Sequence, residues 1–302
     1  MALLFLSCAT LLAAVAWSGS STASSASSAT SGNFAGLVKI DGGRKLFLTC
    51  RGSGAPTVVL ISGFRGAYDD WTHVVPRPEA TPRRSRASVF PRIAESTRVC
   101  AYDRPGTMSF DGALALSSPV RQPTTAEDGV DDLRLLLDAA GAAGPYVLVA
   151  HSWGGMIAYL YVCEHPEEVA GMVLVDPGSL FLKTALRPRQ WGKFARGAKQ
   201  VGKPKILEAA DYERSVDEIL AAPSVPKIPA VVLTSDHPFD FGAGGRRTWP
   251  AWLSAQNRLA AALGAKHITQ TNSGHYIAGE RPGVVVSEVR AVVRDLKGRA
   301  GR

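Results

Sequence analysis

The stretch that most constrains this chain is YVLVAHSWGGMIA, residues 146–158. Its apolar first part, residues 146–149, predicts a short buried strand, and its last part predicts a helix. Between them, Ser152 lies in a small-x-Ser-x-Gly pattern, in which small neighbours let the backbone turn sharply from strand to helix. Such a turn holds the serine hydroxyl clear of the sheet, although a serine that merely caps a helix would fit the same pattern. Ser152 is therefore a candidate nucleophile.

Apolar strands alternate with helices along most of the chain. We expect a hairpin over residues 36–50 and then strands at 57–61, 98–102, 146–149, 171–175, 230–234 and 266–270. Strands that alternate with helices form a parallel sheet with right-handed crossovers. The sequence thus predicts an α/β fold.

Polar residues follow nearly every predicted strand. They are Ser62-Gly63, Asp103, Ser152, Asp176, Asp236 and His275. In a parallel sheet the carboxyl ends of the strands share one edge, and ligands gather there. These residues are therefore expected to surround one site.

Serine needs a general base within reach, and histidine is the usual one. An acid must then fix the imidazole tautomer and stabilise the imidazolium. The chain offers Ser152, then an aspartate, then His275. Chain position alone leaves Asp176 and Asp236 open as that acid.

Six stretches together resemble the α/β-hydrolase superfamily (serine hydrolases, esterase- and lipase-like branch) across nearly all of residues 37–296. They read PTVVLISGF, VCAYDRPG, YVLVAHSWGG, GMVLVDPG, AVVLTSD and SGHYI. The resemblance implies an α/β-hydrolase fold. This fold has a mostly parallel eight-stranded sheet flanked by helices, with a helical lid inserted after the sixth strand.

The same resemblance implies roles for individual residues. It makes Ser152 the nucleophile and His275 the base, and it assigns the backbone N–H groups of Phe64 and Trp153 to the oxyanion hole. It favours Asp236 as the acid, because the family most often places the acid after the next-to-last strand, with Asp176 as the alternative.

Two departures from the family pattern concern the loops of the site. Ser62 stands where many members have histidine, which leaves the backbone donor intact. Met108 interrupts the usual Gly-x-Gly after Asp103-Arg104, so this loop is expected to differ. Asp103 and Arg104 are expected to form a structural ion pair.

The chain divides into four segments. Residues 1–33 combine an apolar run with Ser/Ala-rich sequence and are interpreted as a signal peptide or N-terminal anchor plus a leader. Residues 34–177 form the first part of the hydrolase core, 178–226 the helical lid, and 227–302 the second part of the core. We therefore expect a secreted or cell-envelope protein.

Four cysteines lack the spacing of metal ligands, and we expect no metal and no cofactor. Cys50 and Cys100 lie in two predicted strands, either as buried free thiols or as a disulfide in an exported protein. The sheet order of the resembled family places these strands side by side, which favours a Cys50–Cys100 bridge.

The net charge of +8, from 34 Lys and Arg against 26 Asp and Glu, comes with no nucleic-acid-binding motif, so nucleic acid is not an expected partner. Five arginines crowd a proline-interrupted loop, which is interpreted as a solvated insertion: Arg77, Arg83, Arg84, Arg86 and Arg92. Residues 183–205 of the lid hold eight Lys or Arg and no acid, interleaved with apolar residues. This segment is either a solvated face or a surface that binds anionic lipid or an envelope polymer.

The predicted function is hydrolysis of a small-molecule carboxylic ester through an acyl-enzyme on Ser152. An aminopeptidase of the same fold is the first alternative, although the sequence reveals no acidic pocket for a substrate amine. A non-catalytic ligand-binding protein on this fold is the alternative from another class. The sequence makes no prediction of the oligomeric state.

Overall fold

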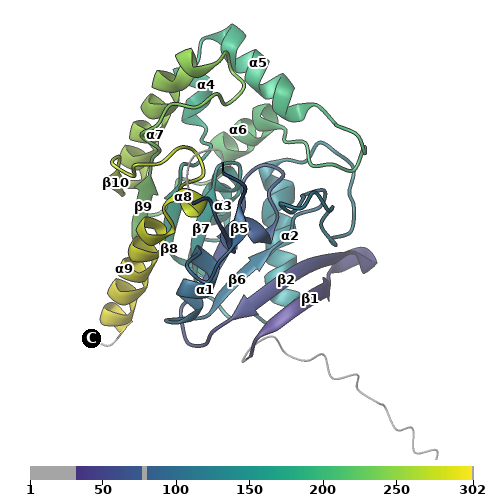
Figure 1. Cartoon of the computed structure of the whole chain (residues 1–302), viewed down its shortest axis with the longest axis vertical. Coiled ribbons are helices and arrows are strands. Elements are labelled where there is room, and N and C mark those ends of the chain that lie inside the picture. The colour runs from purple at the N-terminus through teal and green to yellow at the C-terminus, as the bar shows by residue number, and fades with distance from the viewer. Residues whose placement is uncertain (1–31, 77–79, 301–302) are drawn as a thin grey trace, which may run out of the picture.

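The computed structural model describes residues 32–76 and 80–300, so nearly all of the predicted leader, 1–33, lies outside the described residues. One sheet of eight strands runs through the molecule in the order β1-β2-β6-β3-β7-β8-β9-β10 (Figure 1). The pair β1/β2 and the pair β2/β6 are antiparallel, and all other neighbours in the sheet are parallel. The structure thus has the α/β-hydrolase architecture that the sequence predicts.

The strands follow the predicted apolar runs closely. Their bounds are β1 Phe34–Lys39, β2 Lys45–Arg51, β3 Thr57–Ile61, β6 Val99–Tyr102, β7 Tyr146–His151, β8 Val169–Val175, β9 Ala230–Leu233 and β10 Lys266–Ile268. Two short strands, β4 His73–Val74 and β5 Arg83–Arg84, form a separate antiparallel pair.

Helices cover both faces of the sheet. The α-helices are α1 Val89–Ala94, α2 Ala126–Ala139, α3 Gly154–Glu164, α4 Phe181–Ala185, α5 Pro188–Lys199, α6 Tyr212–Ala221, α7 Trp249–Leu263, α8 Ile277–Glu280 and α9 Pro282–Ala300. The 3-10 turns are η1 Asp41–Gly43, η2 Tyr68–Trp71, η3 Pro166–Glu168 and η4 Arg246–Thr248. In the described part of the chain, no helix is both long and apolar enough to cross a membrane.

The central strands are buried on both faces, which is why they are continuously apolar. In β7, Leu148 and Ala150 pack into the core under α2, α3 and α7, whereas Val147 and Val149 pack into the core under α1 and α9. β3 alternates in the same way. These two cores fix the sheet, and with it the place where each strand ends.

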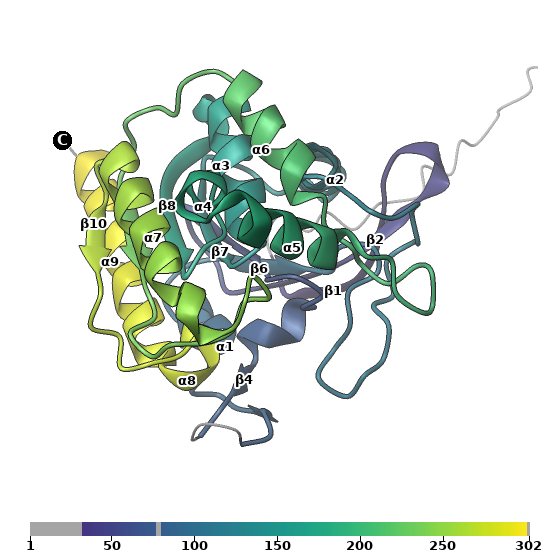
Figure 2. The ribbon, with the colours of Figure 1, turned by 90° about the horizontal axis from the view of Figure 1, so that it is seen from above.

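The 178–226 segment supplies α4, α5 and α6 between β8 and β9. Figure 1 shows these helices at one end of the sheet, and Figure 2, from above, shows α4 and α5 crossing over it. Some apolar residues of this segment are buried, namely Leu182, Leu186 and Trp191, whereas Val201 is exposed. The segment thus contributes apolar side chains to the core.

Cys50 in β2 and Cys100 in β6 are register partners, with Cα atoms 4.1 Å apart, and they form a disulfide in the structure. Both residues are fully buried in the core. Cys163 is a buried free thiol, and Cys8 lies outside the described residues. The bridge ties the antiparallel edge of the sheet to its parallel centre.

Candidate active site

Ser152 occupies the turn between β7 and α3 with a φ of 49°, in the left-handed region that residues with a side chain rarely adopt. Close packing explains the two glycines that follow. A Cβ on Gly154 would lie 2.6 Å from the Ile61 carbonyl oxygen, and one on Gly155 would lie 2.4 Å from Pro177 Cβ. The small residues therefore allow the sharp turn that presents the Ser152 hydroxyl at the edge of the sheet.

Three side chains from different strand ends form one hydrogen-bonded chain. Ser152 Oγ lies 2.9 Å from His275 Nε2, and His275 Nδ1 lies 2.6 Å from Asp176 Oδ2. A carboxylate only accepts hydrogen bonds, so Nδ1 carries the proton and donates to Asp176. In neutral His275, Nε2 is then free to accept the Ser152 hydroxyl proton. This is the tautomer that a general base requires.

Asp176 is fully buried and is oriented by further donors. Its Oδ1 accepts hydrogen bonds from the backbone N–H of Ser235 and from Trp252 Nε1, each at 3.0 Å. With His275 on Oδ2, both carboxylate oxygens have partners. Because these donors come from separate elements, the carboxylate is held in one orientation toward the imidazole.

The expectation that Asp236 is the acid is wrong. Its carboxylate instead accepts hydrogen bonds from the backbone N–H groups of Asn272 and Ser273, at 2.9 and 2.8 Å. Burial by itself raises the pKa of Asp236. The two hydrogen bonds have the larger combined effect in the opposite direction, so the pKa lies below its usual value. Asp236 therefore shapes the loop that leads to His275 without contacting the imidazole.

Competing hydrogen bonds give the physical reason for this correction. The Asp236 carboxylate, which follows β9, is taken up by the backbone N–H groups of the loop before His275. Asp176, at the end of β8, keeps Oδ2 free for His275 Nδ1 while Ser235 and Trp252 hold its Oδ1.

His151, next to Ser152 in the chain, packs against the turn that carries the serine. Its Nε2 lies 2.9 Å from the backbone carbonyl oxygen of His275, and its ring centroid lies 4.7 Å from that of His275. Burial, and then the nearby His275, lowers the pKa of His151 to about 3. His151 is thus a neutral donor that supports the backbone of His275.

The loop after β3 carries the predicted oxyanion donor of Phe64. Neither the Phe64 N–H nor the Trp153 N–H donates to an acceptor among residues 32–76 and 80–300. A Cβ on Gly63 would lie 2.7 Å from His151 Nδ1, so only glycine lets this loop approach the elbow. The Trp153 ring is fully buried against Tyr212, so its indole serves packing.

A buried ion pair holds this loop in place. Arg104 donates to the backbone carbonyls of Ser62 and Gly63 at 2.9 and 2.6 Å, and its Nε lies 2.7 Å from Glu208 Oε1. Burial lowers the pKa of Arg104, but the Glu208 charge outweighs that effect and raises it. The expected Asp103–Arg104 pair is therefore wrong, because Asp103 instead accepts the backbone N–H of Tyr68.

A family model described as "alpha/beta hydrolase fold" matches residues 56–240, more than half of the chain. The chain belongs to the α/β-hydrolase family. Esterases, lipases and an epoxide hydrolase are among the proteins that it resembles.

Individual relatives are similar in sequence to short stretches of this chain. An uncharacterised protein of Schizosaccharomyces pombe is 38% identical over 92 residues, which cover 30% of this chain and 16% of that protein. Lipase LipV of Mycobacterium tuberculosis is 43% identical over 60 residues, which cover 20% of this chain and 23% of the lipase. The match thus spans less than a quarter of the length of either relative.

Solved structures have a similar fold over most of this chain. Est816, described as an N-acyl homoserine lactone degrading enzyme, has a TM-score of 0.58 and 19% identity, covering 85% of this chain and 99% of its own. At this identity the likeness shows the fold alone.

A cavity of about 830 Å³ opens onto Ser152 and His275. Most of its large side chains are aromatic, and Phe239 stacks on the His275 ring at a centroid distance of 4.5 Å. Met108, the departure from the family pattern, also lines this cavity, and its backbone pairs with Arg65 and Ala67 of the oxyanion loop. The site therefore offers an apolar chamber beside the candidate nucleophile.

Sequence reasoning missed Glu208, Trp252 and Phe239. Glu208 lies in the 178–226 segment, 104 residues from Arg104 along the chain, and no local motif marks it. Trp252 belongs to an ordinary amphipathic helix by pattern, although its indole reaches Asp176. Only the fold brings these side chains to the site.

Within the described residues, His165, Glu167 and Glu168 form one cluster with metal-binding residue types, their ligand atoms lying within 4.8 Å of one another. They follow the C-terminal end of α3, whereas Ser152 precedes its N-terminal end. Glu168 is already bound to Arg134 and Tyr161. This cluster takes no part in the Ser152 site.

Proposed function

We propose that this hydrolase cleaves carboxylic esters through an acyl-enzyme on Ser152. The chain of contacts from Ser152 Oγ to His275 and on to Asp176, at 2.9 and 2.6 Å, is the observation that carries the proposal. Serine hydroxyls are weak nucleophiles, and such a chain supplies the base and the acid that activate them.

In the first step Ser152 Oγ attacks the ester carbonyl carbon, and its proton passes to His275 Nε2. His275 becomes an imidazolium, which the buried Asp176 carboxylate stabilises. The carbonyl oxygen takes the negative charge and accepts the N–H groups of Phe64 and Trp153. Donors placed before the reaction stabilise this charge without further reorganisation.

In the second step the tetrahedral intermediate collapses and its bond to the alcohol oxygen breaks. That oxygen takes the proton from His275, and the acyl group stays on Ser152. Water then attacks the acyl carbon while His275 accepts the water proton. The bond from the acyl carbon to Ser152 Oγ then breaks, Oγ takes the proton back from His275, and the carboxylic acid leaves.

The aromatic lining of the cavity favours an ester with a sizeable apolar group on its acyl or alcohol side. Phe64, Phe194, Phe241 and Tyr276 line it together with Phe239. Burying an apolar group against such walls stabilises binding by about 25 cal/mol per Å².

An aminopeptidase is the second candidate, because Asp70 and Glu280 also line the cavity. Two features weaken these carboxylates as ligands for a substrate ammonium. Burial, and then Asp69, raises the pKa of Asp70 to about 8, which leaves it mostly protonated at neutral pH. Glu280 already accepts hydrogen bonds from Ser273 Oγ and the Gly274 N–H.

A fluorophosphonate and a substrate panel test the proposal. We expect the probe to label Ser152, and we expect kcat/KM for p-nitrophenyl esters to exceed that for prolyl and alanyl p-nitroanilides by at least about 100-fold. Preference for the p-nitroanilides would favour the aminopeptidase. No labelling and no turnover of either class would favour a non-catalytic binding protein.

We also propose that the protein is exported and acts at the cell envelope. The apolar start of the chain and the Cys50–Cys100 disulfide support export, because disulfides persist in oxidising compartments. In the 178–226 segment, Lys183 and Lys199 are paired with acids, while Arg189, Lys193 and Arg196 on α5 are exposed and have no carboxylate partner among the described residues. These three cations would attract anionic lipid or an envelope polymer to the mouth of the cavity.

Replacing Arg189, Lys193 and Arg196 by Gln tests this attraction. At low salt we expect the triple variant to bind phosphatidylglycerol vesicles about 100-fold more weakly than the wild type, since each cation near an anionic surface contributes about 1 kcal/mol. Sedimentation with vesicles measures the binding, and moderate salt should weaken it. The control is a triple variant of the exposed Arg247, Arg294 and Arg299. Equal binding to anionic and neutral vesicles would contradict the proposal.

A further inference from the structure

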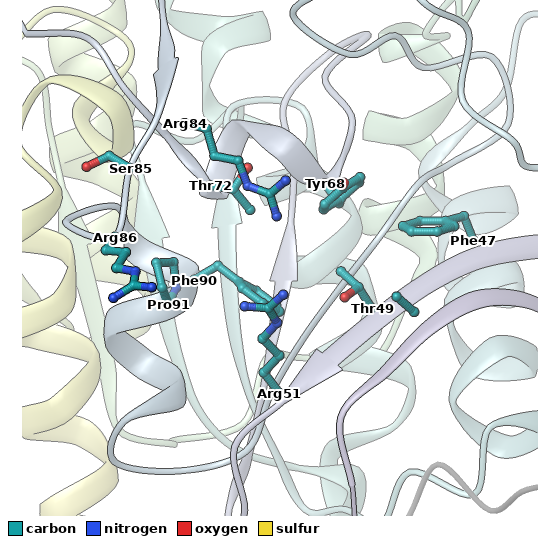
Figure 3. Close-up of a pocket in the computed structure, with 11 residues that line it drawn as sticks. Phe47, Thr49, Arg51, Tyr68, Thr72, Arg84, Ser85, Arg86, Phe90 and Pro91 are labelled. Atoms are coloured by element: carbon teal, nitrogen blue, oxygen red, sulfur yellow. The ribbon is translucent and has the colours of Figure 1, made fainter.

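A second cavity, of about 450 Å³, lies apart from the Ser152 site and shares none of its lining residues. Its walls come from Ala35 of β1, from β2, from η2 and the residue after it, and from the stretch that runs from the end of β5 into α1 (Figure 3). Arg84 and Arg86, two of the arginines expected to form a solvated insertion, are indeed exposed, and both line this cavity.

Three arginines converge on the cavity without acidic partners. Arg51 and Arg84 enter from opposite sides with their guanidinium groups turned toward its middle, and Arg86 lies at its edge (Figure 3). Within residues 32–76 and 80–300, no carboxylate lines the cavity and none forms an ion pair with these three residues. Like charges held near one another repel, so a bound anion would stabilise this arrangement.

Carboxylates lie in the neighbouring hollow on the other side of η2. Asp103 accepts the backbone N–H of Tyr68, and Asp69 accepts that of Phe110 through Oδ2. This hollow shares Phe47, Tyr68, Thr72 and Arg84 with the cavity. None of the described carboxylates there forms an ion pair with Arg84, so its guanidinium group is available to an external anion.

The remaining walls combine hydroxyl groups with aromatic rings. Thr49 and Ser85 contribute hydroxyls, and the Ser85 oxygen accepts a hydrogen bond from the Ala87 N–H, which leaves its own proton available. Phe47 and Tyr68 pack with ring centroids 5.0 Å apart, and the buried Phe90 closes the floor. One part of the cavity thus suits oxygen atoms, and another suits a flat apolar group.

We propose that this cavity binds a small organic anion, with its phosphate or carboxylate head between Arg51 and Arg84 and a planar apolar body against Phe47 and Tyr68. Guanidinium groups bind such heads through paired N–H···O hydrogen bonds. Aromatic walls supply the specificity for the body. The site is separate from ester cleavage, so it stands or falls independently of the proposed function.

Calorimetric titration of the whole protein with phenyl phosphate, benzoate, inorganic phosphate and phenol tests this site. We expect phenyl phosphate or benzoate to bind at least about tenfold more tightly than inorganic phosphate or phenol. Arg51→Gln and Arg84→Gln should each weaken the binding of that anion by about tenfold or more, because each removes charged hydrogen bonds to the head. Higher salt should weaken binding in the wild type.

A variant with Arg247→Gln and Arg294→Gln serves as the control, because both residues are exposed and neither lines the cavity. It should bind like the wild type, and melting curves establish that all variants are folded. Anion binding that is unchanged in the Arg51→Gln/Arg84→Gln double variant, or absent from the wild type, would overturn the site. If inorganic phosphate bound as tightly as phenyl phosphate, and through the same arginines, the proposed contact of a planar group with Phe47 and Tyr68 would be wrong.

Discussion

Replacing Ser152 by Ala is expected to lower kcat for a p-nitrophenyl ester by about 10⁵-fold or more, with little change in stability. The substitution removes the only oxygen within hydrogen-bonding reach of His275 Nε2 among the described side chains. What remains is the rate that the oxyanion donors and substrate binding provide. Steady-state kinetics on purified protein, with active-site titration by a fluorophosphonate, measure the loss.

Ser179→Ala is a matched control for this experiment. Ser179 is also buried, lies three residues after Asp176, and its hydroxyl has no hydrogen-bond partner among the described residues. Its replacement should leave kcat within about twofold of the wild-type value, because the Ser179 hydroxyl contacts none of the reacting groups. Turnover by folded Ser152→Ala protein close to that of Ser179→Ala would refute Ser152 as the nucleophile.

Replacing Asp176 by Asn is expected to lower kcat by about 10⁴-fold, because an amide no longer selects the His275 tautomer with the proton on Nδ1. The buried carboxylate also stabilises the imidazolium that forms when Ser152 attacks, and the amide does not. Melting curves should accompany the kinetics, since Asp176 also accepts bonds from Ser235 and Trp252.

Asp236→Asn provides the comparison that decides between the two aspartates. The amide oxygen still accepts one of the two backbone N–H groups that Asp236 holds, so we expect less than about a tenfold loss in kcat. A larger loss in Asp236→Asn than in Asp176→Asn, at equal stability, would show that the assignment of the acid to Asp176 is wrong.

The sequence by itself determined the fold class and two members of the candidate triad. Continuous apolar runs identify the strands that are buried on both faces, and Ser152 follows such a run. His275 follows the short strand β10 and is marked by its place after Ser152 and the two aspartates along the chain. The two glycines after Ser152 also predict the sharp turn, because residues without a side chain are needed where the backbone packs this closely. These features depend on residues that are close together in the chain, so they can be predicted from the sequence.

Only the tertiary structure decided which acid completes the chain of contacts and what holds the oxyanion loop. Asp176 and Asp236 look alike in sequence, because each follows a buried strand, and the choice depends on which donors the folded chain brings to each carboxylate. Glu208 reaches Arg104 across 104 residues of chain. Short hydrogen bonds and ion pairs depend on distances in space, which strand order and helix packing set and which no spacing along the chain encodes.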